Sequence, residues 1–242
     1  MDYSQFRSFF AISLERNGLQ ALSEQQYERF YAFAEYLLKV NQVTNLTAIR
    51  NMPDVITKHF VDSLLVSDYI PQNACVLDLG CGAGFPSAPL AIARPDLRIV
   101  GLDSTAKKIA FVNEAAKLVG LSNLTAISGR AEDAQTMKQL GKFDVVTSRA
   151  VAALQILSEL CLPYVKLGGM FLPLKAAKAE VELAAARKAI AFLGGSEAIS
   201  HNLSLITDAG EEPRCIFEIK KCMETPKGYP RAYAAILKKP LS

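Results

Sequence analysis

The sequence lacks the residue patterns that mark membrane-spanning, secreted and metal-binding chains. Its 242 residues include no uncharged apolar run of the roughly 20 residues that cross a bilayer. The N-terminus has neither the basic start nor the apolar core of a secretory signal. There are only two histidines, and none of the five cysteines forms a CxxC pair, which argues against a zinc or redox site. We therefore expect a soluble, cytoplasmic protein with free thiols, no metal and no membrane partner.

The composition is that of a globular protein with one basic end. Hydrophobic residues make up 50% and charged residues 21%, and the length suits one sizeable α/β domain with a small appendage. The net charge is only +3, but residues 213–242 hold seven Lys or Arg against two Glu. A basic end of this kind suits a polyanionic partner, although many such ends are only solvated.

The first 72 residues predict helices. Apolar residues recur at helical spacing over residues 2–16, and Ser23 followed by Gln26 has the spacing of a capping box before a second helix. Asp54 is placed to cap a third helix. We expect a helical extension over residues 1–72.

From residue 74 the pattern changes to buried strands that alternate with amphipathic helices. This alternation predicts a parallel sheet with right-handed crossovers. Two further strands within residues 203–223, broken at residues 211–213, predict an antiparallel hairpin at the sheet edge. We expect the main domain over residues 73–225 and a basic tail over residues 226–242. The five parallel strands are expected at residues 75–80, 98–103, 124–128, 143–148 and 169–175.

A glycine loop follows the first predicted strand, where open α/β sheets bind ligands. It runs Asp78-Leu-Gly-Cys-Gly-Ala-Gly-Phe85, with glycines at positions 80, 82 and 84. A dinucleotide fingerprint needs a third glycine three residues after the second, and Phe85 stands there instead. The pattern Asp-x-Gly-x-Gly-x-Gly is typical of S-adenosylmethionine-dependent methyltransferases, whose cationic cofactor favours a nearby carboxylate.

Acidic residues also follow the next two strands. Asp103 ends the second strand, where a carboxylate can accept hydrogen bonds from ribose hydroxyls, as it also does in NAD enzymes. Glu132 follows the third strand and is placed to accept from an adenine amino group. Each has a plain alternative, since Asp103 suits a helix cap and Glu132 suits a helix N-terminus.

Several further motifs run through the chain. They include Asn45-Leu-Thr47, His59-Phe-Val-Asp-Ser-Leu64, Ser148-Arg-Ala150 and Tyr229-Pro-Arg231. With the glycine loop, they make the sequence resemble the RsmG (GidB) family of small-subunit ribosomal RNA guanine-N7 methyltransferases over nearly the whole chain. One departure is Ser87, which stands where the family usually has glycine, and we expect only a local adjustment there.

The resemblance implies a fold, an activity and a cofactor. The fold is that of a class I S-adenosyl-L-methionine-dependent methyltransferase, a Rossmann-like α/β fold. Its seven-stranded, mostly parallel sheet has an antiparallel edge, and helices extend it at the N-terminus. The activity is methyl transfer to N7 of a guanine in the decoding-region loop of 16S ribosomal RNA. The expected cofactor-binding residues are Asp78, Gly80, Gly82, Gly84, Phe85, Asp103, Ala131, Glu132 and Arg149.

The reaction implied by the resemblance suits the residues present. Guanine N7 has an in-plane lone pair and carries no hydrogen, so positioning rather than a general base should supply most of the rate. We interpret Arg149, His59 and Asp62 as positioning residues. The partner would be 16S ribosomal RNA or the small ribosomal subunit, bound by a monomer. The candidate RNA contacts are Lys107, Lys108, Arg130, Lys175 and Arg231.

Other functions remain open at this point. The cofactor loop would serve equally in a methyltransferase for a small molecule or a protein, although such an enzyme has no use for a cationic tail. A non-catalytic RNA-binding assembly factor could keep the cofactor for structural reasons. A NAD-linked oxidoreductase is the weakest alternative because of Phe85.

Overall fold

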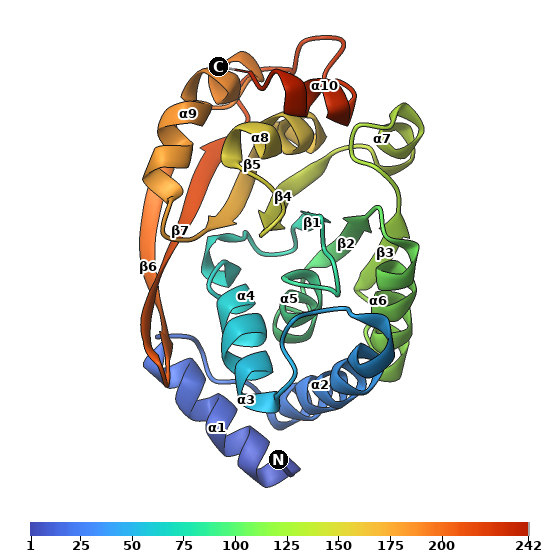
Figure 1. The fold of residues 1–242 in the computed structure, drawn as a ribbon, viewed down its shortest axis with the longest axis vertical. Coiled ribbons are helices and arrows are strands. Elements are labelled where there is room, and N and C mark those ends of the chain that lie inside the picture. The colour runs from blue at the N-terminus through green and yellow to red at the C-terminus, as the bar shows by residue number, and fades with distance from the viewer. Residues whose placement is uncertain (242) are drawn as a thin grey trace.

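The computed structural model describes residues 1–241 and is built on one seven-stranded sheet (Figure 1). The strand order is β3-β2-β1-β4-β5-β7-β6. The first five strands are parallel, and β7 pairs antiparallel with both β5 and β6. The predicted mostly parallel sheet with an antiparallel edge is confirmed. The strands are β1 Cys75–Leu79, β2 Arg98–Asp103, β3 Leu124–Ser128, β4 Phe143–Arg149, β5 Val165–Lys175, β6 Ile199–Thr207 and β7 Gly210–Lys220.

Helices cover both faces of the sheet, and the sheet divides the apolar core in two. Successive strand residues point to opposite faces, so Val145 faces one core and Val146 the other. The first core holds α5, α6 and the N-terminal helices, and the second holds α8, α9 and the C-terminal helix (Figure 1). The connecting helices are α5 Ser87–Ala93, α6 Ala106–Leu118, α7 Ala134–Leu140, α8 Leu154–Cys161 and α9 Ala179–Phe192.

The N-terminal extension consists of α1 Tyr3–Arg16, α2 Glu24–Thr44 and a third helical segment. The predicted capping box of Ser23 and Gln26 is present at α2. The third segment comprises α3 Met52–Asp54, a π-helical stretch Val55–Val61 and α4 Asp62–Leu64. The prediction that Asp54 caps it was wrong. Asn51 is the cap, because its Oδ1 accepts from Asp54 N at 2.9 Å, and the helix therefore begins at Met52.

The extension packs into the same core as the sheet and reaches the glycine loop. The Phe33 ring lies 6.0 Å from the ring of Phe85, in the loop, and 5.9 Å from that of Phe111, in α6. Phe60 of the π-helical stretch is also fully buried in this cluster. The core therefore runs across the predicted boundary at residue 72, and the boundary itself stays a prediction.

The edge hairpin turns earlier than expected. The prediction of a break at residues 211–213 was wrong, because β6 and β7 turn between Thr207 and Gly210, and residues 211–213 lie inside β7. On its other side β7 pairs with β5 only from Cys215 onward. Pro213 therefore lies where a missing N–H is tolerated.

The predicted basic tail folds back onto the domain. Its helix α10 Tyr233–Lys238 packs on α8, with Ile236 fully buried (Figure 1). Ser242 lies outside the described residues. Among residues 1–241, no helix combines the length and apolar character needed to cross a membrane.

Candidate functional site

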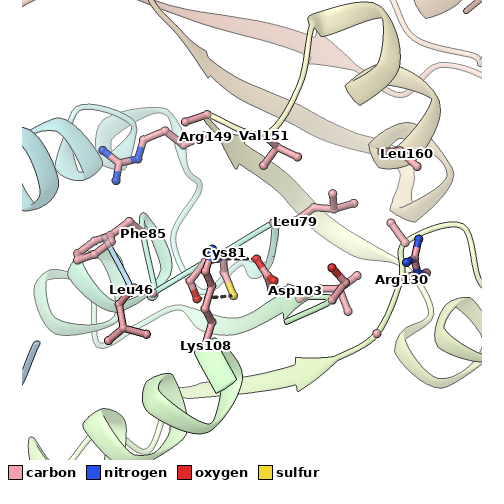
Figure 2. Close-up of a pocket in the computed structure, with 18 of the residues that line it drawn as sticks. Leu46, Leu79, Cys81, Phe85, Asp103, Lys108, Arg130, Arg149, Val151 and Leu160 are labelled. Carbon is pink, nitrogen blue, oxygen red and sulfur yellow. Dashed lines mark hydrogen bonds between the residues drawn. The ribbon is translucent and has the colours of Figure 1, made fainter. Parts of the chain in front are cut away.

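A cavity of about 440 Å³ lies at the carboxyl ends of β1, β2 and β4. Figure 2 shows side chains from these strand ends around a common space, with Phe85 at one side and Leu160 at the other. Seven of the nine expected cofactor-binding residues line the cavity, namely Gly80, Gly82, Phe85, Asp103, Ala131, Glu132 and Arg149. Most of the cofactor-binding residues expected from the sequence therefore lie together in the lining of one cavity.

The glycine loop requires glycine at position 80. Its φ of 78° lies in the left-handed region, and a Cβ at this position would overlap the Val151 side chain. The backbone N–H groups of Gly80 and Cys81 both donate to Leu102 O, at 2.7 and 3.1 Å. The loop is thus fixed to the end of β2. A Cβ on Gly82 would meet no heavy atom within 4 Å, which leaves room for a ligand.

Asp103 supports the loop and also faces the cavity. Its Oδ2 accepts from Gly82 N at 3.0 Å, and its Oδ1 accepts from Thr105 N at 2.8 Å. Helix α6 begins after Thr105, its N-cap residue. A carboxylate has about four acceptor sites, so Asp103 retains capacity for ribose hydroxyls.

Two expected cofactor-binding residues lie behind the cavity wall. Asp78 is fully buried and its Oδ2 accepts from Ser87 N at 3.0 Å, which fixes the start of α5. Burial raises the pKa of Asp78 to about 7. A Cβ on Gly84 would touch Ala88 and Val112 in the core. In this structure both residues shape the loop from behind and do not reach the cavity.

The far end of the cavity includes two residues that the sequence analysis missed. Leu160 comes from α8 and Tyr233 from α10, and both line the cavity near Ala131 and Glu132. The Tyr164 hydroxyl donates to Ala131 O at 2.7 Å and so holds this loop. Nothing in the local pattern around residue 233 indicates a binding role, because the position depends on how the chain end folds back.

The expected positioning residues meet in one cluster, and a fourth residue completes it. Arg149 Nη1 lies 2.6 Å from Asp62 Oδ2, and Arg214 Nε lies 2.6 Å from Asp62 Oδ1. The side chains of all three are between 10% and 16% exposed. Arg214, in β7, was not predicted, because 152 residues separate it from Asp62.

His59 is a neutral member of this cluster. Its Nδ1 lies 3.3 Å from Arg149 Nη2 and its Nε2 lies 2.8 Å from Thr47 Oγ1, while the ring stacks on Phe85 at 4.1 Å. A guanidinium only donates, so Nδ1 accepts and the proton lies on Nε2. Burial, and then the Arg149 charge, lower the pKa of His59 to about 3. The ring therefore positions Arg149 and carries no charge at neutral pH.

A second cavity of about 580 Å³ adjoins the first. The two share Arg149, Ala150 and Val151, the residues that follow β4. Ala150 has a φ of 56°, an unfavourable backbone for a non-glycine residue, and such strain often occurs at functional sites. Residues that line only the second cavity include Asp62, Lys175, Glu182, Glu212 and Arg214.

The candidate RNA contacts fall into two groups. Lys107 and Arg130 are exposed, and Lys108 lines the first cavity. Lys175, by contrast, is only 9% exposed and pairs with Glu182 at 2.7 Å. Arg231 binds the fully buried Glu159 at 2.6 Å. The ion pairs of Lys175 and Arg231 set these two cations apart from the well-exposed Lys107 and Arg130, and the RNA contacts stay a prediction.

The first cavity fits S-adenosyl-L-methionine. Its volume lies within the range of small-molecule sites. Asp103 offers acceptors for the ribose, and Glu132 offers a second carboxylate for the adenine amino group. The side chains of residues 1–241 form no group of three or more His, Cys, Asp or Glu that could hold a metal ion.

Comparison with known proteins identifies close relatives over the whole length. The family model "GidB: rRNA small subunit methyltransferase G" matches residues 26–205. Ribosomal RNA small subunit methyltransferase G of Clostridium beijerinckii is 41% identical over 240 residues, covering 98% of this chain and 99% of the relative. The protein of the same name from Lachnoclostridium phytofermentans is 44% identical over 237 residues, with 97% of each chain covered.

Solved structures with this fold are more distant in sequence. An O-methyltransferase from Bacillus cereus, in complex with SAH, is 17% identical, with a TM-score of 0.56. The match covers 89% of this chain and all of the other. A precorrin-6y C5,15-methyltransferase from Geobacter metallireducens has a TM-score of 0.51 at 17% identity and covers 66% of this chain and 87% of the other. These likenesses support the class I methyltransferase fold.

Proposed function

This chain belongs to the GidB family, rRNA small subunit methyltransferase G, and on that premise we propose that it methylates N7 of a guanine in 16S ribosomal RNA. The methyl donor is S-adenosyl-L-methionine. The observation that carries the proposal is the cavity formed by the glycine loop, Asp103 and the Ala131–Glu132 loop in a chain of this family. The acceptor guanine lies in the decoding-region loop.

The residues around the cavity have separate roles in the proposed reaction. Asp103 accepts from the ribose, Glu132 faces the adenine amino group, and the loop from Gly80 to Phe85 follows the rest of the cofactor. Bound S-adenosyl-L-methionine supplies an electrophilic methyl group on a sulfonium. Arg149 stands at the wall shared with the second cavity, where its clamped guanidinium helps to orient the acceptor.

The reaction needs orientation more than proton transfer. The N7 lone pair attacks the methyl carbon in line with the S–C bond, and no proton leaves N7 in this step. The chemistry agrees with a His59 held neutral by burial and by Arg149, since that ring is not required as a base. Exclusion of water and alignment of the two substrates therefore supply the catalysis.

The acceptor also defines where the protein works. The substrate is the small ribosomal subunit or its RNA, so we place the enzyme in the bacterial cytoplasm, acting as a monomer. The exposed Arg130, which lines the cavity, and the exposed Lys107, next in sequence to the cavity residue Lys108, support binding to a polyanion. Size-exclusion chromatography with light scattering should give the mass of one 26.3 kDa chain.

The decisive experiment uses small ribosomal subunits from a strain that lacks the enzyme. Incubation with purified protein and S-adenosyl-L-methionine, followed by nuclease digestion and mass spectrometry of nucleosides, should yield one 7-methylguanosine per 16S RNA. Borohydride reduction and aniline cleavage at 7-methylguanosine, followed by primer extension, then assign the modified position. Formation of any other methylated nucleoside, or none, would contradict the proposal.

A further inference from the structure

The second cavity is positioned to receive the group that is methylated. It lies between the carboxyl ends of β4 and β5 and the amino-terminal part of the antiparallel β7, and it meets the cofactor cavity only at Arg149, Ala150 and Val151. An acceptor in this cavity would reach the methyl group past those three residues. The volume of about 580 Å³ is ample for one purine nucleotide within the usual range of small-molecule sites.

Two carboxylates on the wall away from the cofactor have acceptor capacity to spare. Glu212 Oε2 lies 2.9 Å from Arg214 Nη2, and its Oε1 has no hydrogen-bond partner among the described residues. Glu182 Oε2 accepts from Leu154 N and from Lys175 Nζ, both at 2.7 Å, and its Oε1 is likewise unused within residues 1–241. Both side chains line the second cavity and neither lines the first.

Guanine has the complementary arrangement of donors. Its N7 lies on one edge of the ring system, and its N1–H and N2–H groups lie on the neighbouring edge and point nearly perpendicular to the N7 lone pair. A guanine whose N7 faces the shared wall at residues 149–151 can therefore turn N1–H and N2–H toward a side wall made of residues that line only the second cavity. Resting on the proposed function, the geometry points to this cavity as the acceptor-guanine site, with Glu212 accepting from N1–H and N2–H.

The arrangement also accounts for selection of the base. Adenine has an acceptor at N1 and no amino group at C2, so it would place a lone pair against the Glu212 carboxylate. Because a charged acceptor without a donor partner is costly when water is excluded, adenine is rejected. Asp62, held between Arg149 and Arg214, fixes the wall between this carboxylate and the cofactor cavity.

Kinetics with Glu212→Gln test the assignment. Removing a negative charge from an RNA-binding surface would by itself strengthen RNA binding, whereas loss of a specific acceptor weakens it. We expect the KM for small ribosomal subunits to rise about tenfold. The Kd for S-adenosylhomocysteine, measured by calorimetry, should stay within about twofold of wild type, because Glu212 does not line the first cavity.

The matched control is Glu211→Gln, the adjacent residue, whose side chain points to the opposite side of β7. It should leave the KM for the subunit unchanged or lower it. If Glu212→Gln has a KM equal to or below that of wild type, the cavity is not the guanine site. If the wild-type protein itself forms no 7-methylguanosine, the proposed function fails instead, so the two failures are distinguishable.

Discussion

At the scale of single residues, the Asp62 carboxylate holds the site together. It lies between two guanidinium groups, and replacing it with alanine would leave Arg149 and Arg214 buried without their counter-charge. We expect Asp62→Ala to lower the free energy of unfolding by about 3–5 kcal/mol, because an uncompensated buried charge is expensive. Urea denaturation followed by circular dichroism measures this loss.

Asp54→Ala is the matched control for that variant. Asp54 also pairs with a cation, Lys58 at 2.8 Å, but both side chains are well exposed and solvent screens them. It should change stability far less than Asp62→Ala does. Equal losses of stability in the two variants would show that the buried ion pairs of Asp62 contribute no more than the exposed ion pair of Asp54.

The lowered pKa of His59 predicts how the stability of the protein depends on pH. Its pKa is about 3 in the folded protein and near 6.5 in the unfolded chain, so the unfolded state binds the proton first. The histidine therefore contributes to a decrease in the free energy of unfolding as the pH falls from 6.5 toward 3. Denaturation of wild type and His59→Gln at pH 7, 5 and 4 should show a shallower decrease in the variant.

The buried Asp78 acts in the opposite direction. Its pKa of about 7 in the folded protein exceeds its usual value of 3.8. Its contribution to the free energy of unfolding is therefore fully present below pH 3.8 and is lost as the pH rises toward 7. Both proteins in the comparison contain Asp78, and its effect cancels in the difference.

Parallel pH profiles for wild type and His59→Gln would contradict the neutral ring.

Loss of the Asp103 carboxylate should weaken cofactor binding more than the loss of its contacts with backbone N–H groups explains. Asp103→Ala removes acceptors for Gly82 N and for the ribose, and we expect the Kd for S-adenosylhomocysteine to rise more than tenfold. Asp133→Ala is the control, because Asp133 also accepts from a backbone N–H near the start of a helix, that of Thr136, but does not line the cavity. Calorimetry on both variants separates the two roles, and similar affinities would count against the assignment.

At the scale of elements, an ion pair just before α10 joins the chain to Glu159 of α8, beside the apolar contact that Ile236 makes. Arg231 binds both oxygens of Glu159, at 2.8 and 2.6 Å, and Glu159 has no exposed surface. Arg231→Ala leaves this carboxylate unpaired, and we expect a loss of about 3–5 kcal/mol in stability. Hydrogen exchange should become faster over residues 231–241. Cofactor affinity should fall as well, since Tyr233 lines the cavity.

Lys238→Ala, on the exposed side of the same helix, serves as the comparison for the α10 prediction. This variant should keep wild-type exchange rates and cofactor affinity. If Arg231→Ala behaves like Lys238→Ala, the ion pair does not hold α10 in place.

The sequence predicted the elements that local patterns determine. The buried strands, the glycine loop and the carboxylate after β2 depend on short-range spacing, and the structure has them. Errors occurred where two candidate caps compete, as with Asn51 and Asp54, because only the backbone geometry decides between them. Residues that reach the site from a distant element, such as Arg214 and Tyr233, have no local pattern that marks them.

At the scale of the whole molecule, the distribution of charge governs how RNA is bound. Lys107 stands exposed at the first turn of α6, next in sequence to Lys108, which lines the cavity, whereas Lys117 is exposed at the last turn of the same helix. Each cation that contacts a phosphate contributes about 0.7–0.9 to the slope of log affinity against log salt concentration. Lys107→Gln should reduce that slope by about this amount.

Lys117→Gln changes the net charge equally and should leave the slope unaltered. Filter binding of 16S RNA over a range of potassium chloride concentrations gives both slopes. Equal reductions in the two variants would mean that binding responds to total charge and not to the face around the cavity.

The ion pairs of Asp62 with Arg149 and Arg214 also set when, during its own synthesis, the enzyme first becomes able to act on its substrate. A nascent chain that has emerged only as far as the fifth strand already contains the glycine loop, Asp103 and Arg149. It still lacks Arg214, and α10 is the last helix of the described chain to emerge. A chain interrupted before these segments can form most of the donor pocket without its completed acceptor side. A ribosome must therefore translate past Arg214 and α10 before the product can modify another ribosome.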